Sequence, residues 1–367
     1  MMTLLKKTPL NKAHHELRAR MIDFAGWQLP VWYTSIVEEH RVVRSGAGIF
    51  DVSHMGRVWI IGRKSGAFLD KLLTRRARRL AIGSSQLCLL CSEDGGILDD
   101  LWVYRLDADR YLIVWNATNI KQKLDWLSHW SASDPDVIIE DRSIDTVMLA
   151  IQGPSVAQLG NLKGVSQLPR FGHTQTRIGD LSVFVARTGY TGEDGFEIIS
   201  HAANALPLWE SFMKQGLKPC GLGARDSLRL EAGMLLYGQD MDKSTNPFEA
   251  GLGGLVEMDN GDFIGKSALL EIKRQGVRRK LIGFQMDGRK IARSGYPILK
   301  SGQEVGKVTS GGYAPTLDVN IGFGYVPIEL ATIGTDIEIM IRNKPVAAKV
   351  VNRQFYKRGA QNEPQRI

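Results

Sequence analysis

The stretch "ILDDLWVYRLDADRYLIVWN" (residues 97–116) predicts a β-hairpin, because two β-prone runs flank a short polar turn. Side chains alternate between the two faces of a strand. The neighbouring aspartates, Asp99 and Asp100, therefore point in opposite directions and need not share a role. One face combines Asp100 with two aromatic residues, Trp102 and Tyr104.

The register of this hairpin determines what Asp100 faces. If Leu106 faces Arg110 across the turn, Asn116 falls opposite Asp100, within cross-strand reach. A carboxylate beside an amide on an aromatic face suits a flat heterocycle. A shift by an odd number of residues removes this pairing, and the alternative is that Asp99 faces water while Asp100 caps a turn.

The segments around the hairpin alternate between helical and strand-like patterns. Apolar spacing predicts helices at residues 36–43, 65–74, 120–130 and 221–236. Runs of β-prone residues predict strands at 57–62, 86–91 and 146–154, and two strands around a glycine-rich loop within 181–200. The remainder of 11–48 reads as mixed helix and loop.

The chain changes character after about residue 245. Residues 246–278 predict a connector with turns. Residues 279–367 hold short alternating segments punctuated by glycine, which predict a small all-β barrel or sandwich. Helices and strands together predict an α+β protein.

Composition indicates an ordinary globular chain of 367 residues, 43% hydrophobic and 23% charged. It has no apolar run of about 18 residues that would predict a membrane helix, and the N-terminus lacks the apolar core of a signal peptide. Cys88 and Cys91 lie in a short apolar run, which predicts buried, reduced thiols and a cytoplasmic location. The 7 histidines form no H-E-x-x-H motif, so we expect no metal site.

The net charge of +8 indicates an acidic partner without identifying it. The densest basic run is "TRRARR" (residues 74–79). It reads as a solvated loop or as a docking site for an acidic protein. A nucleic-acid patch is the weakest interpretation, because nearby aromatic residues or a more charged helical face are missing.

Two further segments carry candidate binding groups. In "RTGYTGEDGFE" (187–197), glycines allow close approach of the backbone to a ligand, and Glu197 can accept two N–H donors from the edge of an aminopyrimidine. The alternative is an ordinary hairpin loop with solvated acids. Arg225 lies in an apolar segment, where it is either partly buried against a carboxylate or one of several surface ion pairs.

Taken together, these segments resemble the aminomethyltransferase, or T-protein, family of the glycine cleavage system. Motifs that match the family run in order along nearly the whole chain: "KTPL", "MIDFAGWQLPVWY", "GIFDVSHMG", "GGILDDL", "VWNATNI", "AIQGP", "RTGYTGEDGFE", "CGLGARDSLRLEAGMLLYGQDMD", "NPFEAGL", "DFIGKSAL", "KIARSGYPIL" and "VTSGGYAPTL".

The resemblance implies a three-domain, cloverleaf-like fold around a tetrahydrofolate channel. Its first domain would be discontinuous (1–55 and 143–245) and its second inserted (56–142), followed by the connector 246–278 and the barrel 279–367. The implied reaction moves the one-carbon unit of aminomethyl-dihydrolipoyl H-protein to tetrahydrofolate. Glycine decarboxylase and dihydrolipoyl dehydrogenase are implied as functional associates, with no nucleic acid and no membrane partner.

Carried over by motif, the family's catalytic carboxylate matches Asp100. The matching folate-pocket positions are Met55, Asn116, Tyr190, Glu197 and Arg225. The chain departs from the family's usual residues at Arg75, Arg76, Leu87 and Gly254, which bears on folate affinity or carrier docking. Alternatives on the same scaffold are a folate-dependent O- or S-demethylase and a non-catalytic folate-binding accessory protein. The intact "GARDSLRLEAGMLLYGQDMD" (223–242) favours the aminomethyltransferase.

Overall fold

The computed structural model describes residues 4–118, 120–132, 134–259 and 261–359. The chain divides into two compact units, each built from several stretches of sequence. The first comprises Met1–Lys71, Arg76–Cys88 and Asp100–Arg225, and the second comprises Leu72–Arg75, Leu89–Asp99 and Asp226–Ile367.

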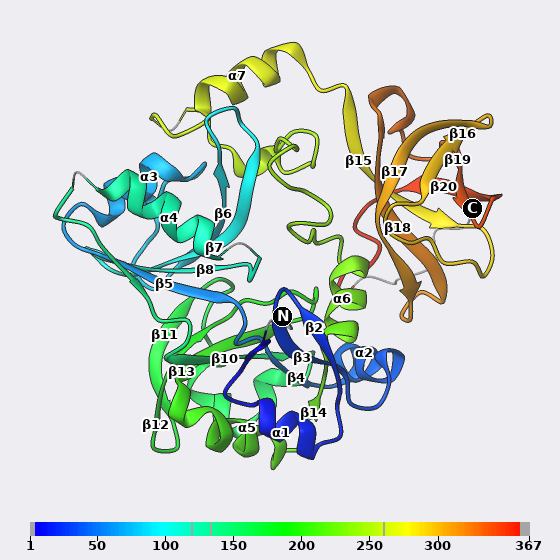
Figure 1. The fold of residues 1–367 in the computed structure, drawn as a ribbon. Coiled ribbons are helices and arrows are strands. Elements are labelled where there is room, and N and C mark those ends of the chain that lie inside the picture. Colours follow the sequence, from blue (N-terminus) through cyan, green and yellow to red (C-terminus); the bar gives the residue numbers. More distant parts are fainter. Residues whose placement is uncertain (1–3, 119, 133, 260, 360–367) are drawn as a thin grey trace. The chain divides into compact units, whose positions relative to one another are not determined.

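The first unit contains a six-stranded sheet whose inner strands are strongly apolar. Val147, Leu149 and Ile151 alternate along one strand and share a core with two helices, α1 (Asn11–Glu16) and α5 (Ala205–Met213) (Figure 1). This alternation leaves the opposite face of the sheet for other contacts. The strands lie in the order β11 (His173–Ile178), β12 (Leu181–Ala186), β13 (Gly195–His201), β10 (Thr146–Gln152), β4 (Gly48–Asp51) and β14 (Lys218–Pro219).

A five-stranded sheet contains the predicted hairpin. One face of strand β8 meets two helices. A Cβ on Gly66 of α3 (Ser65–Leu72) would lie 2.8 Å from the Tyr111 hydroxyl, and Lys123 of α4 (Ile120–Ser131) lies over the Trp115 ring. The strand order is β6 (Ser85–Cys91), β7 (Ile97–Asp107), β8 (Arg110–Trp115), β5 (Gly56–Ile61) and β9 (Ile138–Asp141).

The hairpin register is confirmed except at the turn. Strand β7 pairs with β8 from Leu101 opposite Trp115 onward, which is the predicted pairing. The prediction that Leu106 faces Arg110 is wrong, because a β-bulge places Asp107 opposite Arg110. The alternative that Asp99 faces water is also wrong, since Asp99 is 0% exposed.

A small N-terminal sheet was not expected from the sequence. Strands β1 (Lys6–Lys7), β2 (Arg20–Phe24) and β3 (Trp27–Trp32) lie in the order β1-β3-β2, where we predicted helix and loop. The turn between β2 and β3 has two central residues with positive φ, Ala25 at 51° and Gly26 at 78°. Such turns match the twist of a hairpin, but alanine rarely occupies this region. Helix α2 (Ile36–Ser45) follows, capped by the Ser35 side chain.

The second unit contains a closed six-stranded barrel, which settles the choice between barrel and sandwich. Closure removes the exposed strand edges that an open sheet would present. The strand order is β15 (Arg279–Met286), β18 (Val319–Pro327), β17 (Gln303–Ala314), β16 (Pro297–Lys300), β19 (Asp336–Ile341) and β20 (Lys344–Val351), coloured yellow to red in Figure 1.

Two predicted boundaries change in the structure. Helix α6 (Leu222–Glu231) is shorter than the predicted 221–236, because Gly233 adopts φ 77° and its N–H bonds to Leu230, which ends the helix. The predicted connector contains a further helix, α7 (Lys266–Gln275). Short 3₁₀ helices lie at Ala77–Arg79, Val156–Gln158, Gly160–Val165, Ala202–Asn204, Gly253–Leu255 and Ile328–Leu330.

Candidate functional site

Three predicted site residues lie in a row across the five-stranded sheet: Asp100 within β7, Asn116 just after β8 and Met55 just before β5. The side-chain amide of Asn116 donates to Oδ1 of Asp100 at 2.9 Å and to the Asp100 carbonyl at 3.1 Å. On the other side, β5 pairs Gly56 with Trp115. Met55 therefore lies one step beyond this pair, next to Asn116. The structure thus brings Asp100, Asn116 and Met55 together.

Glu197 lies at the centre of the six-stranded sheet, on the face opposite the apolar core. Its cross-strand neighbours are Ala150 on β10 and Ala186 on β12. Directly opposed residues share a face, so two small methyl groups flank the carboxylate and leave room beside it. Glu197 is 7% exposed, and the Thr188 hydroxyl donates to its Oε2 at 2.6 Å.

The surroundings of Glu197 disfavour its charge. Burial raises the pKa of Glu197 above the usual range, although the Thr188 hydrogen bond and the positive charge of Arg225 oppose this effect.

The Arg225 guanidinium lies over the Tyr190 ring, 4.7 Å from its centre. Its Nη1 is buried and has no hydrogen-bond partner in the part of the chain that the structure describes. A buried donor without an acceptor is costly, so this atom points to a ligand or water that supplies one.

Gln152 fixes the glycine-rich loop that carries Tyr190. Its side-chain amide donates to the Thr188 carbonyl at 3.1 Å, and its Oε1 accepts from Thr191 at 2.9 Å. A Cβ on Gly189 would lie 2.0 Å from Oε1 of Gln152, so only glycine fits there. Gln152 was not predicted as a site residue; the available signal was a polar side chain inside the apolar strand pattern of "AIQGP".

The acids of this loop are paired, so the solvated-loop alternative is wrong. Glu193 accepts from Arg44 at 3.1 Å, and both side chains are nearly inaccessible to solvent. Asp194 pairs with Arg187 at 2.5 Å. These ion pairs anchor the loop on both sides of its turn.

Tyr104 connects the two groups of site residues. Its ring meets the edge of Phe184 on β12 at 5.4 Å between centres, and its hydroxyl lies 3.4 Å from Oγ1 of Thr188, which in turn holds Glu197. Tyr104 shares a face of β7 with Asp100. Four residues of strand separate their Cα atoms by about 13 Å. An acid at one end and a buried recognition carboxylate at the other therefore suit an elongated, flat ligand.

His54 is a further residue that sequence reasoning missed. It is 3% exposed, its Nδ1 has no hydrogen-bond partner among the described residues, and its ring packs edge-on against Phe24. Burial, followed by the charge of Arg225, lowers the pKa of His54 to about 3. The ring is therefore neutral at physiological pH. The signal was its position directly before Met55.

The basic run at 74–79 is partly neutralised within the chain. Arg75 pairs with Glu257 at 3.1 Å, and Arg78 pairs with Asp70 at 2.6 Å. The run is therefore not a fully solvated loop.

Within the described ranges, no group of His, Cys, Asp and Glu is arranged to hold a metal ion. None of the described helices is long and apolar enough to cross a membrane.

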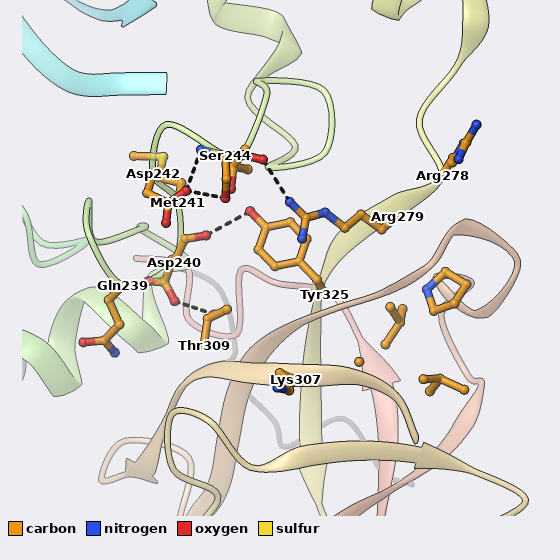
Figure 2. Close-up of a pocket in the computed structure, with 15 residues that line it drawn as sticks. Gln239, Asp240, Met241, Asp242, Ser244, Arg278, Arg279, Lys307, Thr309 and Tyr325 are labelled. Carbon is orange, nitrogen blue, oxygen red and sulfur yellow. Dashed lines mark hydrogen bonds between the residues drawn. The ribbon is translucent and has the colours of Figure 1, made fainter. Parts of the chain in front are cut away.

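A cavity of about 450 Å³ lies in the second unit and holds none of the predicted site residues. Figure 2 shows Tyr325 directing its hydroxyl at Asp240, whose carbonyl accepts it at 2.9 Å. The Asp240 carboxylate accepts from Arg229 and from Thr309, both at 2.6 Å. Because the buried carboxylate of Asp240 already accepts hydrogen bonds from within the protein, this cavity is a poor candidate for the reaction centre.

Comparison with known proteins gives the same assignment as the motifs. Residues 10–260 match the GCVT N-terminal domain, and residues 279–357 match the glycine cleavage T-protein C-terminal barrel domain. The aminomethyltransferase of Symbiobacterium thermophilum is 43% identical over 96% of this chain and 98% of its own length. That of Bacillus subtilis is 44% identical over 97% of this chain and 100% of its own length.

A solved structure agrees with these relatives. The glycine cleavage system aminomethyltransferase T of Bartonella henselae superposes with a TM-score of 0.91 at 34% identity, covering 96% of this chain and 98% of that one. The α+β fold with its C-terminal barrel is confirmed. The chain belongs to the glycine cleavage T-protein family of aminomethyltransferases.

Proposed function

We propose that this protein transfers the one-carbon unit of aminomethyl-dihydrolipoyl H-protein to tetrahydrofolate. The products are 5,10-methylenetetrahydrofolate, ammonia and dihydrolipoyl H-protein. The observation that carries the proposal is a row of neighbouring residues that runs from Asp100 to Glu197. Asp100 and Tyr104 share a face of β7, the Tyr104 hydroxyl lies next to Thr188, and Thr188 donates to Glu197. The aminomethyltransferase names of the relatives favour this activity over a demethylase or an accessory protein.

Tetrahydrofolate fits the buried end of this face. Its aminopyrimidine ring has adjacent N–H donors that match a carboxylate, and its ring oxygen and nitrogen atoms are acceptors. Glu197 would accept the N–H donors, and the unpartnered Nη1 of Arg225 would donate to an acceptor. Tyr190, which lies under the guanidinium, would keep that group in place.

Asp100 is proposed as the catalytic carboxylate. Asn116 donates to it and fixes its orientation, and Met55 lies beside Asn116 at the same strand ends. In the transfer, the carbon of S–CH₂–NH₃⁺ loses its bonds to nitrogen and sulfur and gains bonds to N5 and N10 of the folate. The two folate N–H protons end on ammonia, which leaves as ammonium, and on the thiolate. A carboxylate at the reacting carbon can carry these protons and stabilise an iminium-like cation.

The lipoylated H-protein is the proposed carrier, in functional association with glycine decarboxylase and dihydrolipoyl dehydrogenase. The net charge of +8 would accelerate its encounter if the carrier is acidic. We expect the apparent KM for the carrier to rise with salt, because long-range attraction is screened. A KM independent of ionic strength would remove this part of the proposal.

The test is tetrahydrofolate-dependent ammonia release from aminomethylated lipoyl H-protein. The wild-type protein should release ammonia and form methylenetetrahydrofolate in equal amounts, and Asp100→Asn serves as the matched inactive control. The same substrate preparation is first shown to react with a known aminomethyltransferase. No folate-dependent ammonia from the wild-type protein under those conditions would refute the proposed function.

A further inference from the structure

Helix α4 carries a buried lysine next to the candidate site. Its inward-facing residues include Lys123 and Leu127, one helical turn apart, and Lys123 is only 4% exposed. By contrast, the side chain of Lys121 on the same helix is 92% exposed. Because burying an ammonium group is costly unless its hydrogen bonds are made, the contacts of Lys123 matter to the structure around it.

The ammonium group of Lys123 holds the backbone at Asn116. Its Nζ donates to the Asn116 carbonyl at 2.7 Å. Strand β8 ends at Trp115, so Asn116 is the first residue beyond the ladder. Residues just past a strand end have lost their ladder hydrogen bonds and are prone to fray. Lys123 supplies a hydrogen bond at this point from the helix side of the sheet.

The side chain of Asn116 contacts the candidate acid, Asp100, on the other side of the sheet. The side chain of Asn116 donates to Asp100, on the face that also carries Tyr104. Asn116 is thus hydrogen-bonded on both sides of the sheet. Its backbone carbonyl accepts from Lys123, and its side-chain amide donates to Asp100. A displacement of the carbonyl would move the amide that orients the carboxylate.

The aromatic ring beneath Lys123 is fully buried. The ammonium lies 5.0 Å from the centre of the Trp115 ring, in the geometry of a cation–π contact. Trp115 is 0% exposed and lies directly against Gly56, where a Cβ would come within 1.8 Å of its Nε1. The missing side chain at Gly56 therefore leaves the space that the indole ring below Lys123 occupies.

We propose that Lys123 is a positioning residue for the aminomethyl transfer, holding Asn116 so that Asn116 orients Asp100. This inference rests on the proposed function for its catalytic consequence. Lys123 lies on the helix side of the sheet and acts through Asn116, without touching substrate. Its loss should reduce the rate of the chemical step while leaving the aminopyrimidine contacts of Glu197 intact.

The experiment compares Lys123→Met, Lys123→Gln and Lys123→Arg with the wild-type protein, and uses Lys121→Met as the control on the exposed side of the helix. Lys123→Met should lower kcat roughly 10- to 100-fold with a KM for tetrahydrofolate within about twofold of wild type. Lys123→Arg, which keeps a charged donor, should recover most of the loss. Lys121→Met should behave as wild type.

Hydrogen–deuterium exchange of the peptide spanning 110–118 gives a readout independent of activity. In Lys123→Met this peptide should exchange faster, whereas peptides from the six-stranded sheet should not change. Lys123→Gln is measured in the same way should the methionine variant fail to fold. Unchanged kcat in the soluble variants, or equal loss in Lys121→Met, would overturn the proposal. Without wild-type activity the proposed function fails, and unchanged exchange at 110–118 would then refute the positioning role separately.

Discussion

Replacing Glu197 with glutamine should weaken folate binding and stabilise the free protein. The substitution keeps the shape of the side chain and an oxygen that can accept from Thr188. It places an amide N–H where the carboxylate would accept from the aminopyrimidine. Hydrogen bonds to a charged group contribute about 1.5–3 kcal/mol each. Loss of one such bond raises the Kd for tetrahydrofolate by roughly 10- to 150-fold, and loss of two raises it further.

The stability of the free protein should change in the opposite direction. Burial raises the pKa of Glu197, so folding disfavours its charged form at neutral pH. Removing that charge should therefore raise the melting temperature without ligand. Titration calorimetry measures Kd, and scanning fluorimetry measures melting with and without tetrahydrofolate. An unchanged Kd together with a lower melting temperature would refute both parts of the reasoning.

Three other substitutions test neighbouring features. Asp100→Asn should lower kcat roughly 10²- to 10⁴-fold while tetrahydrofolate still binds, as single-turnover kinetics and titration would show; unchanged turnover would contradict the assignment. Gly189→Ala should clash with Gln152, lower the melting temperature and raise the Kd for folate; a neutral result would show that the loop relaxes freely. His54, whose pKa falls to about 3 in the fold, gives stability that is complete above pH 6.5 and is lost as pH falls toward 3. Between pH 7 and pH 5 its share is about 2 kcal/mol, so urea unfolding of His54→Gln should show that much less pH dependence than wild type.

The strand arrangement around Asp100 could be predicted because it depends on local rules. Alternation and turn length set the pairing of β7 with β8, and the observed register of Leu101 with Trp115 follows. The bulge before Asp107 could not be predicted, since it depends on how the strands twist. The turn at Ala25 and Gly26 was missed because alanine gives no signal for positive φ.

The candidate site could be predicted only in part. Glu197 and Arg225 were expected from their chemistry and from the family motifs, and in the structure the positive charge of Arg225 opposes the rise in the pKa of Glu197 that burial causes. Gln152 and Lys123 were missed because their roles depend on partners that the sequence alone does not bring near. Gln152 bonds to a loop 36 residues away. Lys123 looks, in sequence, like one of several solvated charges on a helix.

The most direct test is a crystal structure with tetrahydrofolate bound. We predict that the aminopyrimidine N–H groups lie within hydrogen-bond distance of the Glu197 carboxylate and that Nη1 of Arg225 donates to the ligand. We also predict that N5 and N10 of the folate lie close to the Asp100 carboxylate, which Asn116 orients. A folate bound elsewhere, or in the reverse orientation with its aminopyrimidine at Asp100, would contradict the account.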